Sequence, residues 1–174
     1  MQKNGLSTLQ KIKKVSEILR TICTYLLVFV ALITVVSVIS LSVGVGAVTY
    51  NNLIPETSGL AVGTRLLVAA AFGLVLGALF KCLYHLRRLF GNYARGEIFT
   101  RESVGELRSF GMACLLWGVL NFVWALSLSL SLSMHLQRSF EAHFDSLAIG
   151  AVLIAIAWFM DLAVELKEEN ELTI

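Results

Sequence analysis

Residues 21–43 form an apolar run without a single charged side chain, and three similar runs follow it in the sequence. A helix needs about 20 mostly apolar residues to cross the hydrocarbon core of a bilayer. In lipid a lone segment satisfies its backbone polar groups only as a helix, so each run is expected to be helical. The sequence therefore predicts an all-α integral membrane bundle of four transmembrane helices, built as a single domain over residues 1–174. The other three runs cover about residues 66–83, 110–132 and 147–164.

The composition fits this class. Apolar residues make up 57% of the chain and charged residues 15%, which is far from the balance of a soluble domain. The formal net charge is only +2, and the basic residues lie in separate blocks, so no direct nucleic-acid partner is expected. No CxxC spacing occurs, which disfavours a disulfide framework. We expect Cys23, Cys82 and Cys114 to be small packing residues.

The distribution of Lys and Arg predicts the orientation in the membrane. Most of the 14 basic residues precede the first run or lie between the second and third runs. The two other connections, about residues 44–64 and 133–146 with their flanks, hold only Arg65 and Arg138. Because connections rich in Lys and Arg stay in the cytoplasm, both termini and the middle connection are predicted to be cytoplasmic.

The middle connection carries signals for the start of a helix. Thr100 suits an N-cap, and Phe99 before it has the spacing that allows packing against Val104. Gly96 supplies the preceding turn. We therefore expect a short amphipathic helix to begin at Thr100 and to merge into the third apolar run.

A resemblance to a known family is carried by Gly96-x-Ile98-Phe99-Thr100 in this segment and by the ending Leu166–Ile174. These segments resemble an uncharacterised family of small bacterial membrane proteins, domain of unknown function 2975, whose members also have four apolar spans. The resemblance implies a bacterial inner membrane and no established activity. It also implies a frequent genetic neighbour, a small helix-turn-helix regulator of the Cro type, and so suggests regulation or signalling. The residues that carry it are Gly96, Ile98, Phe99, Thr100, Val104, Leu107, Arg108 and Gly111, with the ending Leu166–Ile174.

Small residues recur every four positions along the second run, at Ala69, Gly73 and Gly77, and so share one helix face. Such a face allows two helix backbones to approach closely. We favour a contact with another helix of the same chain, and a homo-oligomer formed through these residues is the alternative. Cys114 and Gly118 offer the third run a similar face.

The fourth run ends on an acidic face, because Asp161, Glu165 and Glu169 follow at intervals of four residues. Either the arginines of the middle connection face these carboxylates, or the acidic tail is solvated. Lys81 and Asp161 are the only charges inside the four runs, and they lie at similar depth near the cytoplasmic boundary. We therefore predict that Asp161 pairs with Lys81, or failing that with Arg87 or Arg88, against the alternative of a hydrated Asp161.

No catalytic, cofactor or metal constellation is apparent. His135, Glu141, His143 and Asp145 lie near one another in sequence, but their spacing matches no metal site, and we expect a solvated connection. An enzyme is therefore not expected, and neither is a cofactor.

The charged and patterned residues concentrate on the predicted cytoplasmic side. We therefore favour a non-enzymatic membrane protein that acts as a regulatory or signalling module with a cytoplasmic partner. The alternative is a small transporter or permeation-associated subunit, which would be expected to carry ionisable residues at mid-membrane or broken helices. The structural or interaction candidates are Lys81, Arg87, Arg88, Gly96, Phe99, Thr100, Arg108, Asp161, Glu165 and Glu169.

Overall fold

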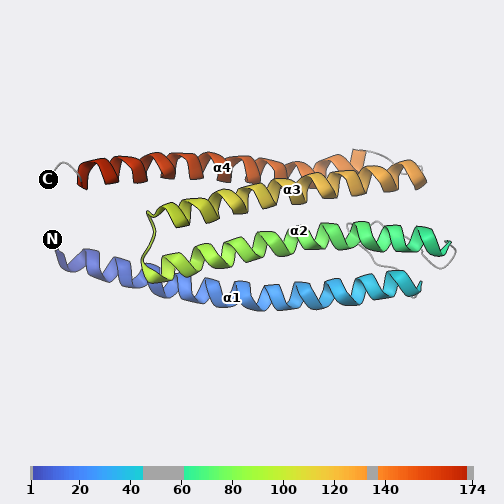
Figure 1. Cartoon of the computed structure of the whole chain (residues 1–174), viewed down its shortest axis with the longest axis horizontal. Helices are drawn as coiled ribbons and strands as arrows, with labels where there is room; N and C mark the ends of the chain where they lie inside the picture. Colours follow the sequence, from blue (N-terminus) through green and yellow to red (C-terminus); the bar gives the residue numbers. More distant parts are fainter. Residues whose placement is uncertain (1, 45–60, 133–136, 172–174) are drawn as a thin grey trace.

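The computed structural model contains four long helices, and each is long and apolar enough to cross a membrane (Figure 1). The structure describes residues 2–44, 61–132 and 137–171, with side chains for 9–44, 61–124 and 145–170, and these segments contain no strand. The predicted all-α class with four apolar helices is thus confirmed. The helices are α1 (Gln2–Val43), α2 (Val62–Arg95), α3 (Arg101–Leu132) and α4 (Gln137–Glu171).

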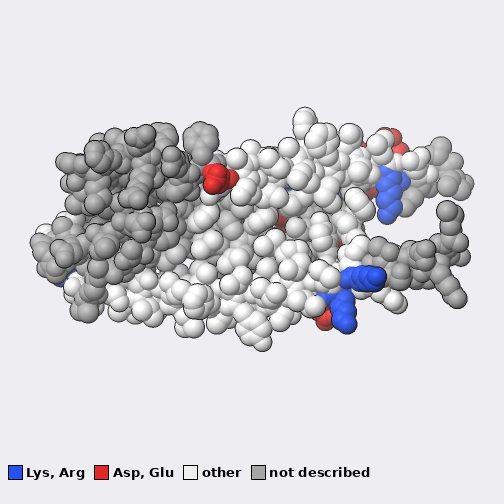
Figure 2. Space-filling model, turned by 180° about the vertical axis from the view of Figure 1, so that it is seen from behind, with Lys and Arg blue, Asp and Glu red and all other residues white. Residues whose placement is uncertain are grey.

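The four helices lie side by side in chain order (Figure 1). Within the described residues, α1 packs against α2, α2 against α3 and α3 against α4, and no other pair of helix backbones comes close. Both chain termini and the turn between α2 and α3 lie at one end of the molecule, which we call the terminal end (Figure 1). Viewed from the opposite side, the middle of the described surface is almost uncharged, and Lys and Arg gather toward the terminal end (Figure 2).

Helix α2 continues well past the apolar run, so the middle connection is mostly helical. Arg87, Arg88 and Arg95 lie within α2, and only residues 96–100 separate α2 from α3. The extension remains helical because it continues to bury apolar side chains: Leu89 packs with Leu107 of α3 and Ala157 of α4. Residues 84–108 therefore form a helical hairpin at the terminal end.

The turn of this hairpin is fixed by a cap on each helix. Gly96 has a φ of +87°, and its amide donates to the carbonyl oxygen of Tyr93 at 3.0 Å, while the Glu97 amide donates to that of Asn92 at 3.0 Å. This pair of bonds is a Schellman motif, which requires a left-handed residue where glycine carries no strain. Lys13 of α1 covers the turn, because a Cβ on Gly96 would lie 2.7 Å from its Cε atom.

Helix α3 begins at Arg101, directly after the predicted N-cap. The hydroxyl of Thr100 accepts a hydrogen bond from the Ser103 amide at 3.3 Å, so the predicted helix start is confirmed. Val104 is buried, whereas Phe99 is 55% exposed. The packing of Phe99 against Val104 therefore stays a prediction.

The core away from the terminal end joins α1, α2 and α3. The rings of Phe72 and Trp124 pack with centroids 5.9 Å apart, and Leu41 of α1 is completely buried against this cluster. The small-residue face of α2 meets α1 here, since Ala69 is buried and a Cβ on Gly73 would touch Val38 at 3.5 Å. This contact supports the interpretation within one chain for that part of the face. A Cβ on Gly77, by contrast, would meet nothing within 4 Å.

Helices α3 and α4 approach each other closely at a pair of glycines. A Cβ on Gly111 would lie 3.2 Å from the carbonyl oxygen of Gly150, and a Cβ on Gly150 would lie 3.0 Å from that of Gly111. Gly118, which the sequence suggested for such a contact, packs in the same way against Leu147. Cys114 instead belongs to a buried cluster with Cys82 of α2.

This contact predicts opposite effects for one substitution at two positions of α3. Gly111→Ala should lower the free energy of unfolding by about 1–3 kcal/mol, because the new methyl group collides with backbone atoms of α4. Gly105→Ala should be neutral or stabilising by up to about 1 kcal/mol, because Gly105 has open space around it and alanine favours the helix. Unfolding in detergent micelles, followed by circular dichroism, measures both. Equal effects of the two substitutions would contradict the close contact.

Candidate functional site

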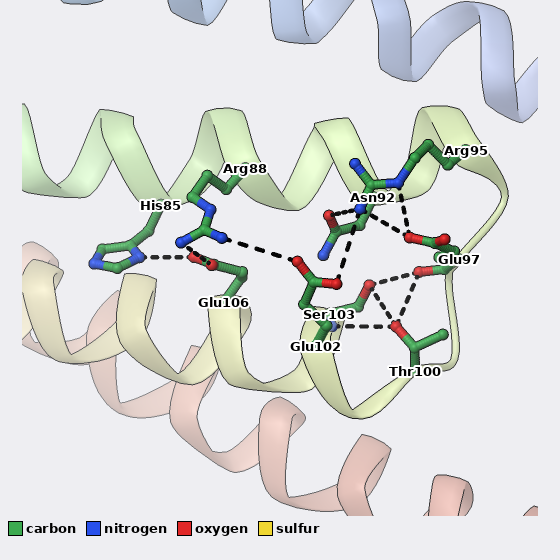
Figure 3. Close-up of polar contacts among 9 residues, drawn as sticks. All are labelled: His85, Arg88, Asn92, Arg95, Glu97, Thr100, Glu102, Ser103 and Glu106. Atoms are coloured by element: carbon green, nitrogen blue, oxygen red, sulfur yellow. Dashed lines mark hydrogen bonds and ion pairs between the residues drawn. The ribbon is translucent and has the colours of Figure 1, made fainter.

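Polar side chains at the terminal end form a continuous network within the helical hairpin (Figure 3). Three of its members, Asn92, Ser103 and Glu106, are buried, which is costly for polar groups unless they have partners. We call this set of side chains the polar network; it comprises His85, Arg88, Asn92, Arg95, Glu97, Thr100, Glu102, Ser103 and Glu106.

The carboxylate of Glu106 is the centre of the network. Glu106 is only 7% exposed, and its Oε2 atom lies 2.8 Å from Nδ1 of His85. Its Oε1 atom lies 3.0 Å from a guanidinium nitrogen of Arg88. A carboxylate only accepts hydrogen bonds, so His85 donates from Nδ1. Both oxygens are engaged, and this geometry clamps α3 to α2.

A second layer extends toward the turn. Glu102 lies between Arg88 and Arg95, with a nitrogen–oxygen distance of 3.9 Å to each. Arg95 also contacts Glu97 at 2.8 Å and donates to the side-chain oxygen of Asn92 at 2.7 Å. The charged side chains of this layer are about half exposed, so each ion pair is weak, and their contribution comes from acting together.

The turn itself is closed by hydroxyl groups. Ser103 is fully buried, and its hydroxyl donates to the backbone carbonyl of Glu97. Thr100 lies within hydrogen-bond distance of that hydroxyl at 3.2 Å. The residues that cap α3 therefore also hold the loop that follows α2, which makes the hairpin a stiff unit.

A separate ion pair joins α3 to α4. Arg101 and Glu168 meet through two parallel contacts, of 2.6 and 3.1 Å. Hydrogen bonding to the Arg101 guanidinium lowers the pKa of the Glu168 carboxyl below its usual value of 4.5. Both side chains are exposed, so solvent screens this contact.

At the acidic face of α4, Arg101 pairs with Glu168, which lies beside the predicted residues Asp161, Glu165 and Glu169. Asp161 and Glu165 line a small cavity of about 110 Å³ together with Arg101. The charge of Arg101 thus faces several carboxylates, although its direct partner is Glu168.

The predicted pairing of Asp161 with Lys81 is wrong. No ion pair joins Asp161 to Lys81, Arg87 or Arg88 among the described residues, and Lys81 is exposed. The reason is the order of the helices, because α3 lies between α2 and α4 and keeps their backbones apart. Similar depth in the membrane is therefore not sufficient for contact.

The remaining sequence candidates differ in their surroundings. Gly96 and Thr100 cap the hairpin, and Arg88 belongs to the polar network. Arg87 is half-buried beside a cavity on the α1 side, whereas Arg108 is exposed. The lone exposed aromatic of the turn is Phe99.

Sequence reasoning missed the partners that complete the network, namely His85, Asn92, Glu102 and Glu106. His85 and Asn92 share a helix face with Arg88, and Glu102 and Glu106 are spaced by one turn. Pairs that lie at similar distances before and after Gly96 meet in an antiparallel hairpin. This signal becomes readable only when α2 is known to continue to Arg95.

No group of three or more His, Cys, Asp or Glu side chains that could hold a metal ion occurs in the part of the chain that the structure describes. The side chains of His135, Glu141 and His143, considered above for a metal, lie outside that part.

A comparison with known protein families identifies the family to which the chain belongs. The model of a family described as "Protein of unknown function (DUF2975)" matches residues 45–174, about three quarters of the sequence. The chain belongs to the DUF2975 family. The matched region contains the whole polar network and Glu168, whereas α1 precedes it. No curated protein and no solved structure matches the chain.

The network predicts that Glu106 and Glu102 differ in importance. Glu106→Gln should lower the free energy of unfolding by about 1–3 kcal/mol, because the buried amide offers one acceptor oxygen, instead of two, to His85 and Arg88. Glu102→Gln should cost less than about 1 kcal/mol, because Glu102 is half exposed and its contacts are long. Unfolding in micelles and amide exchange over residues 84–108 measure both. A larger effect at Glu102 would show that Glu106 is not the centre.

The contact between Arg101 and Glu168 predicts a dependence on pH. Because the pKa of folded Glu168 is lowered, the contact stabilises the end of α4 above pH 4.5 and is lost as the pH falls through the lowered value. A carbon-13 NMR titration of the Glu168 carboxyl should give a midpoint below 4.5 that rises in the Arg101→Gln variant. The same midpoint in both proteins would rule the contact out in solution.

Proposed function

We propose that this DUF2975 protein is a non-enzymatic, multi-pass protein of the bacterial inner membrane, with both termini in the cytoplasm. In this proposal it is a regulatory or signalling module that acts through its terminal end on a cytoplasmic partner, such as a helix-turn-helix regulator. The orientation is supported by the concentration of Lys and Arg at the terminal end.

The observation that carries the proposal is the stiff helical hairpin with an exposed aromatic residue at its turn. Phe99 lies beyond the apolar runs and is 55% exposed, while its neighbours Gly96 and Thr100 are fixed by caps. Lipid accounts for exposed apolar side chains within the runs, such as Phe159 at 71%. Phe99 lies outside these runs. An exposed aromatic on a rigid support is a favourable anchor for a protein partner.

The distribution of charge supports a module of this kind over the transport alternative. Within the described parts of the four apolar runs, the charged residues are Lys81 and Asp161, both toward the terminal end. The side-by-side helices also bring together no set of ionisable groups at mid-membrane among those residues. A transport path is usually lined by such groups.

Transcript profiling of chromosomal variants tests the function. Deletion of the gene should change the transcript levels of a defined set of genes, and Phe99→Ala should reproduce much of that change because it removes the anchor. Phe159→Ala is the matched control, since it removes the same side chain from the lipid-facing surface. Unchanged transcripts in the deletion strain would refute a regulatory role.

Reporter fusions test the orientation separately. Fusions after Asn92 and Ile174 should report the cytoplasm, and fusions near Asn52 and Glu141 should report the outside. A cytoplasmic signal at Asn52 would mean that the first apolar run does not cross the membrane.

A further inference from the structure

A cavity rich in arginine lies on the α1 side of the helical hairpin, away from the proposed partner anchor at Phe99. Its volume is about 370 Å³, and its lining includes Arg20 of α1 with Tyr84, Arg87, Arg88, Asn92 and Arg95 of α2. Arg20 crosses over Gly91, where a Cβ would lie 3.9 Å from its Cδ and Nε atoms. We call this the arginine cavity. A second cavity of about 440 Å³, lined in part by Lys13 and Lys14, adjoins it through Arg20 and Arg95.

The charges around the arginine cavity are unbalanced. Glu102 is the single acidic residue in its lining, against four arginines. Arg88 and Arg95 have acidic partners in the polar network, but Arg20 and Arg87 form no ion pair with any described residue. Guanidinium groups that line one cavity repel one another, and an anion bound between them relieves that repulsion.

A second, independent observation concerns the side-chain amide of Asn92. Asn92 is 3% exposed, and its oxygen accepts a hydrogen bond from Arg95. Because arginine only donates, this contact fixes the orientation of the amide and leaves Nδ2 as the donor. Nδ2 is buried and has no partner among the described residues. Buried donors usually have an acceptor, and Asn92 also lines the arginine cavity, so an acceptor bound there would lie beside this amide.

The donors identify the chemistry of the missing acceptor. Guanidinium groups match the oxygens of a phosphate group, which accepts several hydrogen bonds and carries negative charge. Arg88 is held in place by Glu106 and by the ring of Tyr84, whose centroid lies 6.0 Å from its Cζ atom. A phosphate group would thus meet a partly preformed site.

We propose that the arginine cavity binds a phosphate group and thereby ties α1 to the helical hairpin. The group belongs either to the headgroup of an anionic phospholipid or to a soluble phosphate compound. Tyr84 and Arg87 lie where α2 leaves its apolar run, at a depth that a headgroup reaches. Basic residues are commonly enriched on one side of a membrane protein. This general tendency does not explain why the buried amide of Asn92 has a donor without a partner among the described residues.

The experiment uses the full-length protein in nanodiscs of phosphatidylcholine, alone or mixed with phosphatidylglycerol. Inorganic phosphate is titrated into the phosphatidylcholine nanodiscs, with sodium chloride at equal ionic strength as the control for screening. The thermal midpoint of unfolding is measured in each case. Native mass spectrometry of the micelle-solubilised protein counts the retained phosphatidylglycerol.

Two variants remove the site and one serves as the matched control. Asn92→Asp keeps the size of the side chain and its contact with Arg95 but replaces the buried donor with a negative charge. Arg87→Gln removes a guanidinium that forms no ion pair with the described residues. Each should weaken anion binding about tenfold or more, the loss of one charge-assisted contact. Arg108→Gln removes an exposed arginine outside the cavity and should change binding less than about twofold.

The outcomes distinguish the two sources. Stabilisation and retention with phosphatidylglycerol alone would assign the site to a lipid headgroup, and stabilisation by inorganic phosphate would assign it to a soluble compound. Equal stabilisation of the wild type and both cavity variants would overturn the proposal, as would an equal loss in Arg108→Gln. The absence of any stabilisation of the wild type would overturn it too. None of these results depends on a protein partner. They therefore test the anion site independently of the proposed function.

Discussion

Hydrocarbon offers no hydrogen-bond partner to the peptide backbone, and the arrangement of this protein follows from that constraint. Each apolar run has to form a helix, and apolar side chains gain nothing from leaving lipid for protein. Phe159 and Trp158 accordingly lie largely exposed on α4. Close packing has to come from shape instead. The glycines at 111 and 150 allow the backbones of α3 and α4 to approach closely. The van der Waals contacts made there stabilise the pair of helices.

The opposite rule holds at the terminal end, where water is near and polar contacts decide the structure. Glu106 is buried, and its desolvation is offset by His85 and Arg88 on the neighbouring helix. Leu89 keeps α2 packed beyond its apolar run. The hairpin is therefore stiff where a loop would have been mobile, and the arginine cavity depends on that stiffness, since Arg88 and Asn92 belong to both.

The sequence predicted the features that local patterns determine. Four apolar runs specified four helices, and Gly96 and Thr100 specified the turn because cap geometry depends only on near neighbours. The contacts between helices were beyond local patterns. The order of the helices ruled out Lys81 with Asp161, and the register of an antiparallel hairpin brought Glu106 to His85. These contacts depend on which helices are neighbours. The neighbours of each helix cannot be inferred from one sequence alone.

The side-by-side order of the helices also bears on how the protein assembles. Every close contact between described helix backbones joins elements that are consecutive in the chain. Each of α2, α3 and α4 packs against the helix that precedes it in the chain, so its partner is synthesised before it. Such local connectivity is typical of fast folding with few competing arrangements. This order allows assembly in the direction of translation, with α4 docking onto α3 after the first three helices are in place.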